Sequence, residues 1–375
     1  RDMVNSRGNT TKLQEVFGSE VPPEFDWTEY SVIRMPVNTL PEGFMDEGQV
    51  SRAKATVHSG IYNMEYGACF TTDSQGFFKR SLLEACTTSP SEPVTLPSGD
   101  VSFESLLKGS PDQKYIFGVD PASEVDNFSI VVLEVRGDHR RIVHCWTTNR
   151  QQHKDKLKSK IVDEDDFYSY CAKKIRQLMK VFPCEEIALD AQGGGIAVME
   201  ALHDKDKIPE GEVAIWPVIE EKAKDTDDHS GLHILRLCQF ARADWLAEAN
   251  HGLRKDFEDK VLLFPFFDSA SIGLSIEHDK VAGRKYDTLE DCVMEIEELK
   301  DELSMIVMTQ TATGRERWDT PEVKTGAGRK SRLRKDRYSS LLMANMSARN
   351  FTTEKNISEF STIGGFAQRD NSAKF

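Results

Sequence analysis

The part of the chain that most limits its possible folds is a set of three apolar runs separated by short polar turns. The runs cover residues 115–120, 129–135 and 141–149, and the turn between the last two reads "RGDHR". Short runs of apolar and β-branched residues with turns of this length predict consecutive antiparallel strands. Residues 115–149 therefore predict the antiparallel part of a larger sheet.

After these runs the pattern alternates between helix and strand. Residues 163–182 begin with acidic side chains and then repeat apolar ones at helical spacing, and residues 185–190 form another short apolar run. The other main expected elements are a strand at 213–219, a helix at 232–259, a strand at 261–265, a helix that starts at 289 and turns β-like by 319, and a helix at 335–349. This order predicts an α/β fold, a ribonuclease-H-like mixed sheet flanked by helices, preceded by a smaller α/β or irregular region.

Composition suggests where domains begin and end. Residues 91–113 are rich in Pro, Ser, Gly and Asp, which is typical of a linker, and the polar residues 351–375 predict a flexible C-terminal tail. We therefore expect a first region at 1–90, a linker at 91–113, the main domain at 114–350 and the tail.

Cysteine usage and hydropathy exclude several classes of protein. The seven cysteines are scattered and form no C-x-x-C pair, which argues against a disulfide framework or a zinc site. No apolar run approaches the roughly 18 residues that span a bilayer, and the first residues lack a signal-peptide core. Walker A, dinucleotide-binding, H-E-x-x-H and G-x-S-x-G motifs are all absent. These features predict a soluble intracellular chain without nucleotide, zinc-protease or serine-hydrolase chemistry of its own.

Three aspartates stand where apolar runs end or a helix begins. Asp120 and Asp190 each close an apolar run before a turn, and Asp336 lies in the first turn of the last helix. Carboxylates from two strand ends and one helix start can converge, and such oxygen ligands suit Mg²⁺ or Mn²⁺. Two ions about 4 Å apart would activate water and stabilise a leaving oxygen. Asp126 would supply a fourth oxygen. The alternative is that these acids are ordinary strand-terminating, turn and helix-capping residues.

Charge is unevenly distributed. The net charge of −14 argues against a nucleic-acid partner, but residues 324–337 are strongly basic and contain a single acid. Such a segment either grips phosphate or forms a solvated basic loop. The candidate DNA-binding residues within it are Arg329, Lys330, Arg332, Arg334, Lys335 and Arg337.

The stretches "GVDPASEVDNFSIVVLEV", "EEIALDAQGGGIAVMEAL" and "RKDRYSSLLMANMSAR" occur in this order. Together they resemble the three acidic motifs of the large terminase subunits of tailed bacteriophages, and the resemblance covers about residues 25–350. It implies a ribonuclease-H-like endonuclease that cuts concatemeric double-stranded DNA with two Mg²⁺ or Mn²⁺ ions. It also implies that Asp120, Asp190 and Asp336 are the metal ligands and catalytic residues, with Asp126 as an accessory ligand.

The same resemblance implies a set of partners. They are double-stranded DNA, the portal protein, the small terminase subunit and the packaging ATPase domain of the same full-length protein, the end of which would be residues 1–90. The protein would work in the host cytoplasm and transiently at the procapsid portal. Two alternatives stay open: another ribonuclease-H-like nuclease of the resolvase or transposase type, and a catalytically weak module that docks to the portal or motor.

Overall fold

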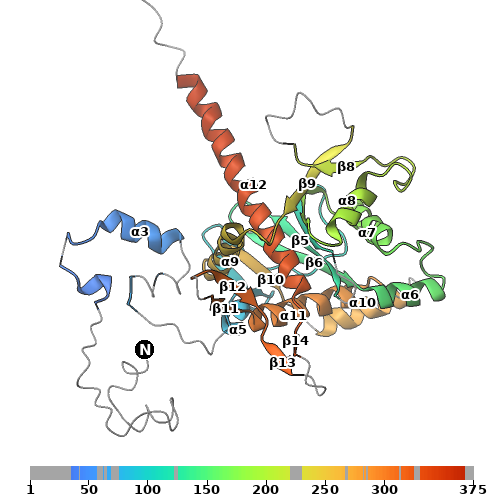
Figure 1. Cartoon of the computed structure of the whole chain (residues 1–375), viewed down its shortest axis with the longest axis horizontal. Helices are drawn as coiled ribbons and strands as arrows, with labels where there is room; N and C mark the ends of the chain where they lie inside the picture. Colours follow the sequence, from blue (N-terminus) through green and yellow to red (C-terminus); the bar gives the residue numbers. More distant parts are fainter. Residues whose placement is uncertain are drawn as a thin grey trace, which may run out of the picture. The chain divides into compact units, whose positions relative to one another are not determined.

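The computed structural model forms two compact units, Arg1–Ser74 and Gln75–Phe375. In the first unit the described elements are the 3-10 helix η3 (Val37–Thr39) and the helix α3 (Glu47–Thr56). The second unit contains the main sheet (Figure 1). The residues whose structure is described are 35–41, 43–56, 62, 66–68, 76–121, 126–219, 230–266, 269–281, 283, 286–311, 314–324 and 330–367.

A mixed sheet of eight strands runs in the order β1-β10-β6-β5-β4-β7-β9-β8. Strands β4, β5 and β6 form the expected antiparallel meander, and β7 and β9 then add to the other side of β4 in parallel. If these five strands are numbered in chain order, their spatial order in the sheet is 3-2-1-4-5, and strand 2 (β5) runs antiparallel to its neighbours. This is the ribonuclease-H-like arrangement, so the predicted fold class is confirmed. The strands are β1 (Thr87–Thr88), β4 (Lys114–Asp120), β5 (Phe128–Val135), β6 (Arg140–Thr148), β7 (Cys184–Asp190), β8 (Ile215–Pro217), β9 (Leu232–Cys238) and β10 (Leu262–Pro265).

Helices cover both faces of this sheet (Figure 1). On one face α7 (Phe167–Val181) and α8 (Gly195–His203) pack on alternate residues of β4 and β5. On the other face lie α5 (Arg80–Ala85), α9 (Ala243–Glu258), α11 (Leu289–Met305) and α12 (Asp336–Ala367). Because both faces are buried, the central strands are almost continuously apolar rather than alternating.

The predicted helix at 232–259 is wrong in its first part. Leu232–Cys238 is strand β9, and only Ala243–Glu258 is helical. Leu235 stands opposite Ile187 of β7, so pairing with a distant strand decides the conformation of a segment whose own pattern is ambiguous.

The structure also differs from the expected boundaries at 91–113 and at 351. Residues 91–113 contain the hairpin of β2 (Val94–Leu96) and β3 (Gly99–Val101), and Val94 and Val101 are buried in the core of the second unit. The first division of the chain falls after Ser74, and α12 continues to Ala367. The apolar side chains of the hairpin explain why this Pro- and Gly-rich stretch packs against the sheet.

The remaining elements surround the sheet. The expected β-like turn after α11 is the hairpin of β11 and β12, and no helix among the described residues is long and apolar enough to cross a bilayer. These elements are α6 (Arg150–Lys158), α10 (Ser269–Val281), β11 (Val307–Gln310), β12 (Glu316–Asp319), β13 (Glu322–Lys324) and β14 (Lys330–Arg332).

Candidate active site

Two of the predicted acids lie on neighbouring parallel strands. Asp120 is the last residue of β4 and Asp190 the last residue of β7, and the residues before them, Val119 and Leu189, are direct partners. The ends of parallel strands meet at the same edge of a sheet, so both carboxylates leave the sheet there.

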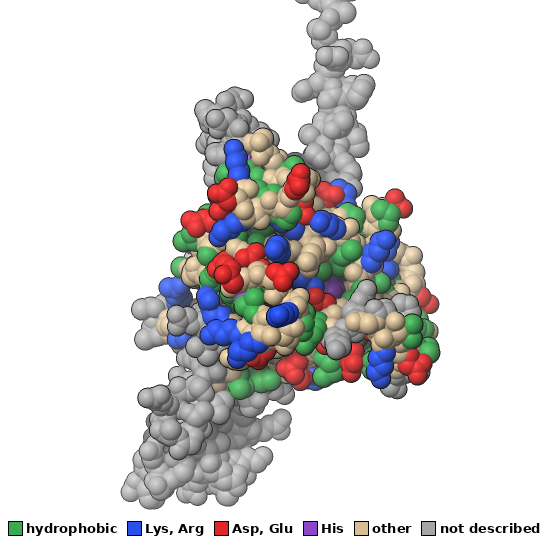
Figure 2. Space-filling view, turned by 90° about the vertical axis from the view of Figure 1, so that its right-hand side faces the viewer, with side chains coloured by type: hydrophobic (Ala, Val, Ile, Leu, Met, Phe, Trp, Pro, Cys, Tyr) green, Lys and Arg blue, Asp and Glu red, His purple; other side chains and the backbone are tan. Residues whose placement is uncertain are grey.

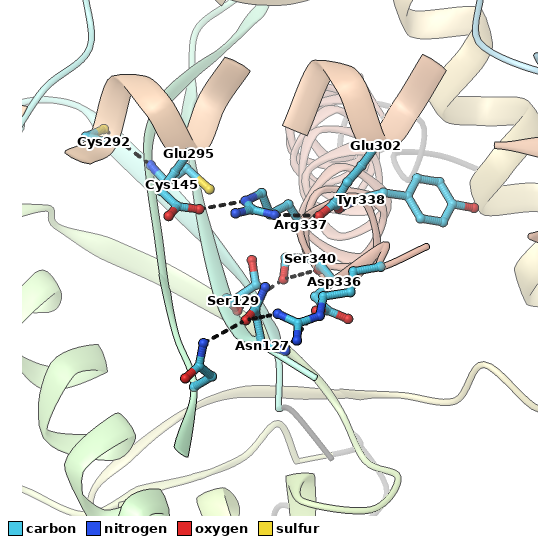
Figure 3. Close-up of polar contacts among 12 residues, drawn as sticks. Asn127, Ser129, Cys145, Cys292, Glu295, Glu302, Asp336, Arg337, Tyr338 and Ser340 are labelled. Atoms are coloured by element: carbon cyan, nitrogen blue, oxygen red, sulfur yellow. Dashed lines mark hydrogen bonds and ion pairs between the residues drawn. The ribbon is translucent and has the colours of Figure 1, made fainter. Parts of the chain in front are cut away.

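Asp336 reaches the same edge from the start of α12. Its Oδ2 accepts a hydrogen bond of 2.9 Å from the backbone N–H of Asn127, the residue before β5 (Figure 3). Strand β5 begins beside the end of β4, with Ser129 opposite Asp120. The sheet and the helix therefore bring all three predicted acids to one edge.

The electrostatic environment of these acids is unfavourable to their charged forms. Burial raises the pKa of Asp120 well above its ordinary value of 3.8, and the charges of Asp336 and Asp190 raise this pKa further. Burial also raises the pKa of Asp190, against the lowering effect of the Gln192 N–H, and burial raises the pKa of Asp336. None of these three carboxylates forms an ion pair with a Lys or Arg side chain that the structure describes.

Asp126 lies near this group, in the exposed turn before β5. Its charge contributes to the raised pKa of Asp336, which indicates that the two carboxylates are close. The structure thus places the predicted accessory acid at the rim of the same edge.

Ser340 connects α12 to the end of β4 and the start of β5 by hydrogen bonds. Its hydroxyl oxygen accepts a hydrogen bond of 3.1 Å from the backbone N–H of Asp120. The same oxygen lies 3.1 Å from the carbonyl oxygen of Ser129 (Figure 3). The helix approaches closely because β4 has Gly118 beneath it, where a Cβ would lie 1.9 Å from the carbonyl oxygen of Ser340. Glycine is therefore required at this crossing.

Arg337 does not lie on the DNA-facing surface that the basic segment predicted. Its side chain is buried, with Nε 2.6 Å from Glu295 and Nη1 2.6 Å from Glu302 (Figure 3). Glu302 also accepts a hydrogen bond of 2.9 Å from the N–H of Tyr338, one of the unpaired donors at the start of α12. We therefore assign Arg337 to an internal ion-pair network that holds the first turn of this helix.

The sequence analysis did not single out Glu302. Glu295 and Glu302 are seven residues apart in α11, on the side that also carries the buried Leu299 and Leu303. The sequence does carry a signal for it, since two acids stand at helical spacing among the buried positions of α11. Buried acids require a cationic partner, so this pattern predicts an internal ion pair.

The other basic candidates are distributed differently. Arg334 donates to Oδ1 of Asn127 at 2.8 Å, which places it beside Asp336, and Lys335 pairs with Asp319 at 3.2 Å. The backbones of Lys330 and Arg332 belong to strand β14, and Arg329 lies outside the described residues. Among the side chains of the predicted set that the structure describes, Arg334 thus lies beside Asp336.

The carboxylate oxygens of Asp120, Asp190 and Asp336 are ligands of the kind that a hard divalent cation prefers. Among the described residues, no three His, Cys, Asp or Glu side chains already form a metal-binding group. Mg²⁺ usually takes only one or two carboxylates together with waters and substrate phosphates, so a preformed protein cage is not required. Asp120 and Asp190 supply carboxylates of this kind on adjacent strands.

No protein-family model and no curated protein matches the chain. Among solved structures, the large terminase nuclease of thermophilic phage G20c with bound magnesium is 14% identical, covering 73% of this chain and 98% of that one, with a TM-score of 0.42. The large terminase of another thermophilic bacteriophage is 8% identical, covering 81% of this chain and 53% of that one, with a TM-score of 0.41. The HK97 bacteriophage large terminase is 13% identical, covering 81% and 51%, with a TM-score of 0.37.

This chain thus spans about half the length of the last two proteins. The three solved structures are two large terminases and the nuclease of a third.

Proposed function

We propose that this chain is the nuclease part of a viral DNA-packaging motor, a metal-dependent endonuclease that cuts concatemeric double-stranded DNA. The observation that supports this most is the placing of Asp120, Asp190 and Asp336 at one edge of a ribonuclease-H-like sheet. Their pKa values are all raised, and no described Lys or Arg side chain pairs with them. Acids held in this way are suited to bind cations.

The roles of the residues follow from their positions. Asp120 and Asp190 would hold two Mg²⁺ or Mn²⁺ ions between the strand ends, with Asp336 completing the second set of ligands and Asp126 supplying an outer oxygen. Bound ions of this kind lower the pKa of water and stabilise the charge that develops on a phosphodiester. The N–H of Asn127 would hold the Asp336 carboxylate, and Ser340 the backbone of Asp120, in place before DNA arrives.

Arg334 would contact the phosphate backbone beside these acids. Such contacts fix the register of the duplex without reading its sequence. We further propose the packaging ATPase domain of the full-length protein, the portal protein and the small terminase subunit as partners, which would bring the DNA to this site.

The test is cleavage of supercoiled plasmid in Mn²⁺, in Mg²⁺ and in EDTA, with Asp120→Ala and Asp190→Ala as variants. We expect nicking and linearisation that require metal and disappear in both variants, while circular dichroism and urea unfolding show that each variant is folded. Cleavage that survives in Asp190→Ala, or that proceeds in EDTA, would refute the assignment. A strong preference for branched over linear DNA would instead favour a resolvase.

A further inference from the structure

Helix α6 begins beside the candidate active site. Its N-cap residue, Asn149, accepts a hydrogen bond of 2.9 Å from the N–H of Gln152, and its Nδ2 donates to Oδ1 of Asn127 at 3.3 Å. The N–H of Asn127 is the group that binds Asp336. Two hydrogen bonds thus connect Asn149, through Asn127, to the carboxylate of Asp336. Arg150, the first residue of α6, follows Asn149 directly.

Arg150 is also held close to the turn that follows Asp190. The guanidinium lies over the rings of Phe167 and Tyr168, with its carbon 4.9 and 5.0 Å from the two ring centroids. The hydroxyl of Tyr168 in turn lies against Gly194, where an added Cβ would be 2.5 Å from it. Two aromatic rings thus fix Arg150 between the side of the site that holds Asp336 and the glycine turn after Asp190.

The hydrogen-bonding capacity of Arg150 is not met within the described residues. Its Nε is fully buried and has no hydrogen-bond partner, and no described carboxylate lies within ion-pair distance of the guanidinium. A buried charged donor without an acceptor costs free energy, because its hydration is lost and nothing replaces it. The planar guanidinium matches a phosphate group, to which it can donate two parallel hydrogen bonds.

Two further cations extend from Arg150 along α6. Lys154 and Lys158 follow at intervals of four residues, which places all three on one side of the helix over about 12 Å. Both lysines are exposed, and Oδ1 of Asp155 lies 3.9 Å from Nζ of Lys158. Figure 2 views the molecule from the side on which α6 lies in Figure 1, and several groups of Lys and Arg side chains lie on that face.

We propose that this row of Arg150, Lys154 and Lys158 binds the phosphate backbone of the DNA, with Arg150 holding a phosphate next to the metal-binding carboxylates. The row lies outside the basic segment that the sequence singled out. The proposal deepens the nuclease function proposed above and rests on it. It assigns the duplex contacts along α6 in addition to the contact with Arg334.

The test is the salt dependence of duplex binding in EDTA, where no cleavage occurs. A fluorescently labelled linear duplex is titrated with protein at salt concentrations between about 50 and 200 mM. Over this range the affinity of a protein for DNA falls measurably with added salt, and the slope reports the number of phosphates contacted. We expect Arg150→Gln to weaken binding roughly tenfold, as for loss of a charged hydrogen bond, and to reduce the logarithmic salt slope by about 0.9. Lys154→Gln with Lys158→Gln should reduce the slope by about 1.8.

The controls separate charge from geometry and position. Arg150→Lys keeps the charge but loses the planar fork, so we expect it to restore the slope while affinity stays below that of the wild type. Lys114→Gln with Lys180→Gln removes two exposed lysines at the opposite edge of the sheet and should leave the slope unchanged. Urea unfolding confirms that each variant is folded.

The outcomes distinguish this proposal from the nuclease proposal. Unchanged affinity and slope in the α6 variants, or a wild type that does not bind the duplex, overturns the role of α6. Metal-dependent cleavage that is lost in Asp190→Ala would still support the nuclease in the first case. Conversely, the expected slopes without any cleavage would support the α6 surface and reject the catalytic function.

Discussion

Replacing Gly118 by alanine tests whether α12 sets the geometry of the site. Gly118 lies within β4, paired with Val131 on one side and Ala188 on the other. A Cβ there would lie 1.9 Å from the carbonyl oxygen of Ser340 and 2.9 Å from the Cβ of Ala344. A carbon–oxygen contact needs at least about 3.3 Å, so helix and strand must separate by about 1.4 Å.

This displacement has two separable costs. Overpacking of a well-packed core lowers the free energy of unfolding by about 1–3 kcal/mol. The shift also carries Asp336 and Ser340 away from Asp120, and misplacing a reacting group by about 1 Å costs about 100-fold in rate. We therefore expect Gly118→Ala to remain folded, to be less stable by that amount and to cleave plasmid about 100-fold more slowly.

The assays are urea unfolding and the initial rate of supercoiled-plasmid cleavage in Mg²⁺. Gly137→Ala is the matched control, because Gly137 lies in the turn between β5 and β6 with no atom within 4 Å of an added Cβ. This control should match the wild type in both assays. If Gly118→Ala also matches the wild type, the close approach of α12 is not required. A stability loss with an unchanged rate would refute the positioning argument alone.

Three further predictions concern the charges. Asp120→Asn should abolish cleavage yet stabilise the metal-free protein at pH 8, because it removes a charge that burial and Asp336 disfavour; a stability loss in urea would contradict this. Since the folded-state pKa values of Asp120, Asp190 and Asp336 are raised, protonation favours the folded state, so metal-free stability should fall as pH rises above the ordinary value of 3.8. Added Mg²⁺ should restore stability at pH 8 but not at pH 4, as measured by thermal unfolding; equal effects at both would count against ligation. Glu302→Ala should lower the free energy of unfolding by about 1.5–3 kcal/mol, because it removes one of the two carboxylates bound to buried Arg337 and the acceptor of the Tyr338 N–H. Lys114→Ala, in an exposed pair, should cost less than about 1 kcal/mol by the same urea unfolding assay.

The parts of the fold that the sequence predicted correctly are those with local signals. The meander of β4, β5 and β6 has apolar runs and short turns, and Asp120 and Asp190 mark the ends of runs that the structure confirms as strands. The position of an acid at a strand end is a local property, because the change from apolar run to turn occurs at that residue. Convergence on one edge then follows from parallel pairing.

The errors concern side-chain direction and distant partners. Arg337 adjoins Asp336 in a basic segment, and composition alone predicted that it faces solvent. In the helix, successive side chains point about 100° apart, so Arg337 turns into the interior while Asp336 faces the strand ends. Its partners, Glu295 and Glu302, lie on a different helix, and no local pattern reveals that pairing.

The alternative interpretation of Asp120, Asp190 and Asp336, as capping and turn residues, can be tested against an acid of the same chain that does cap a helix. Asp166 caps α7, accepts a hydrogen bond of 2.8 Å from the N–H of Ser169, and has a lowered pKa. Asp336 occupies the first turn of α12, where the helix dipole also favours a negative charge, yet its pKa is raised.

The difference lies in the surroundings of the two acids. Asp336 is buried, and the charge of Asp126 raises its pKa further. Of its two nearby cations, Arg337 is committed to Glu295 and Glu302, and Arg334 binds the side chain of Asn127. A capping role explains the charge on Asp166 but does not explain why the chain gathers Asp120, Asp190 and Asp336 where the charges of the last two raise the pKa of Asp120. A bound cation would reverse that balance, since it lowers the pKa of every carboxylate that it contacts.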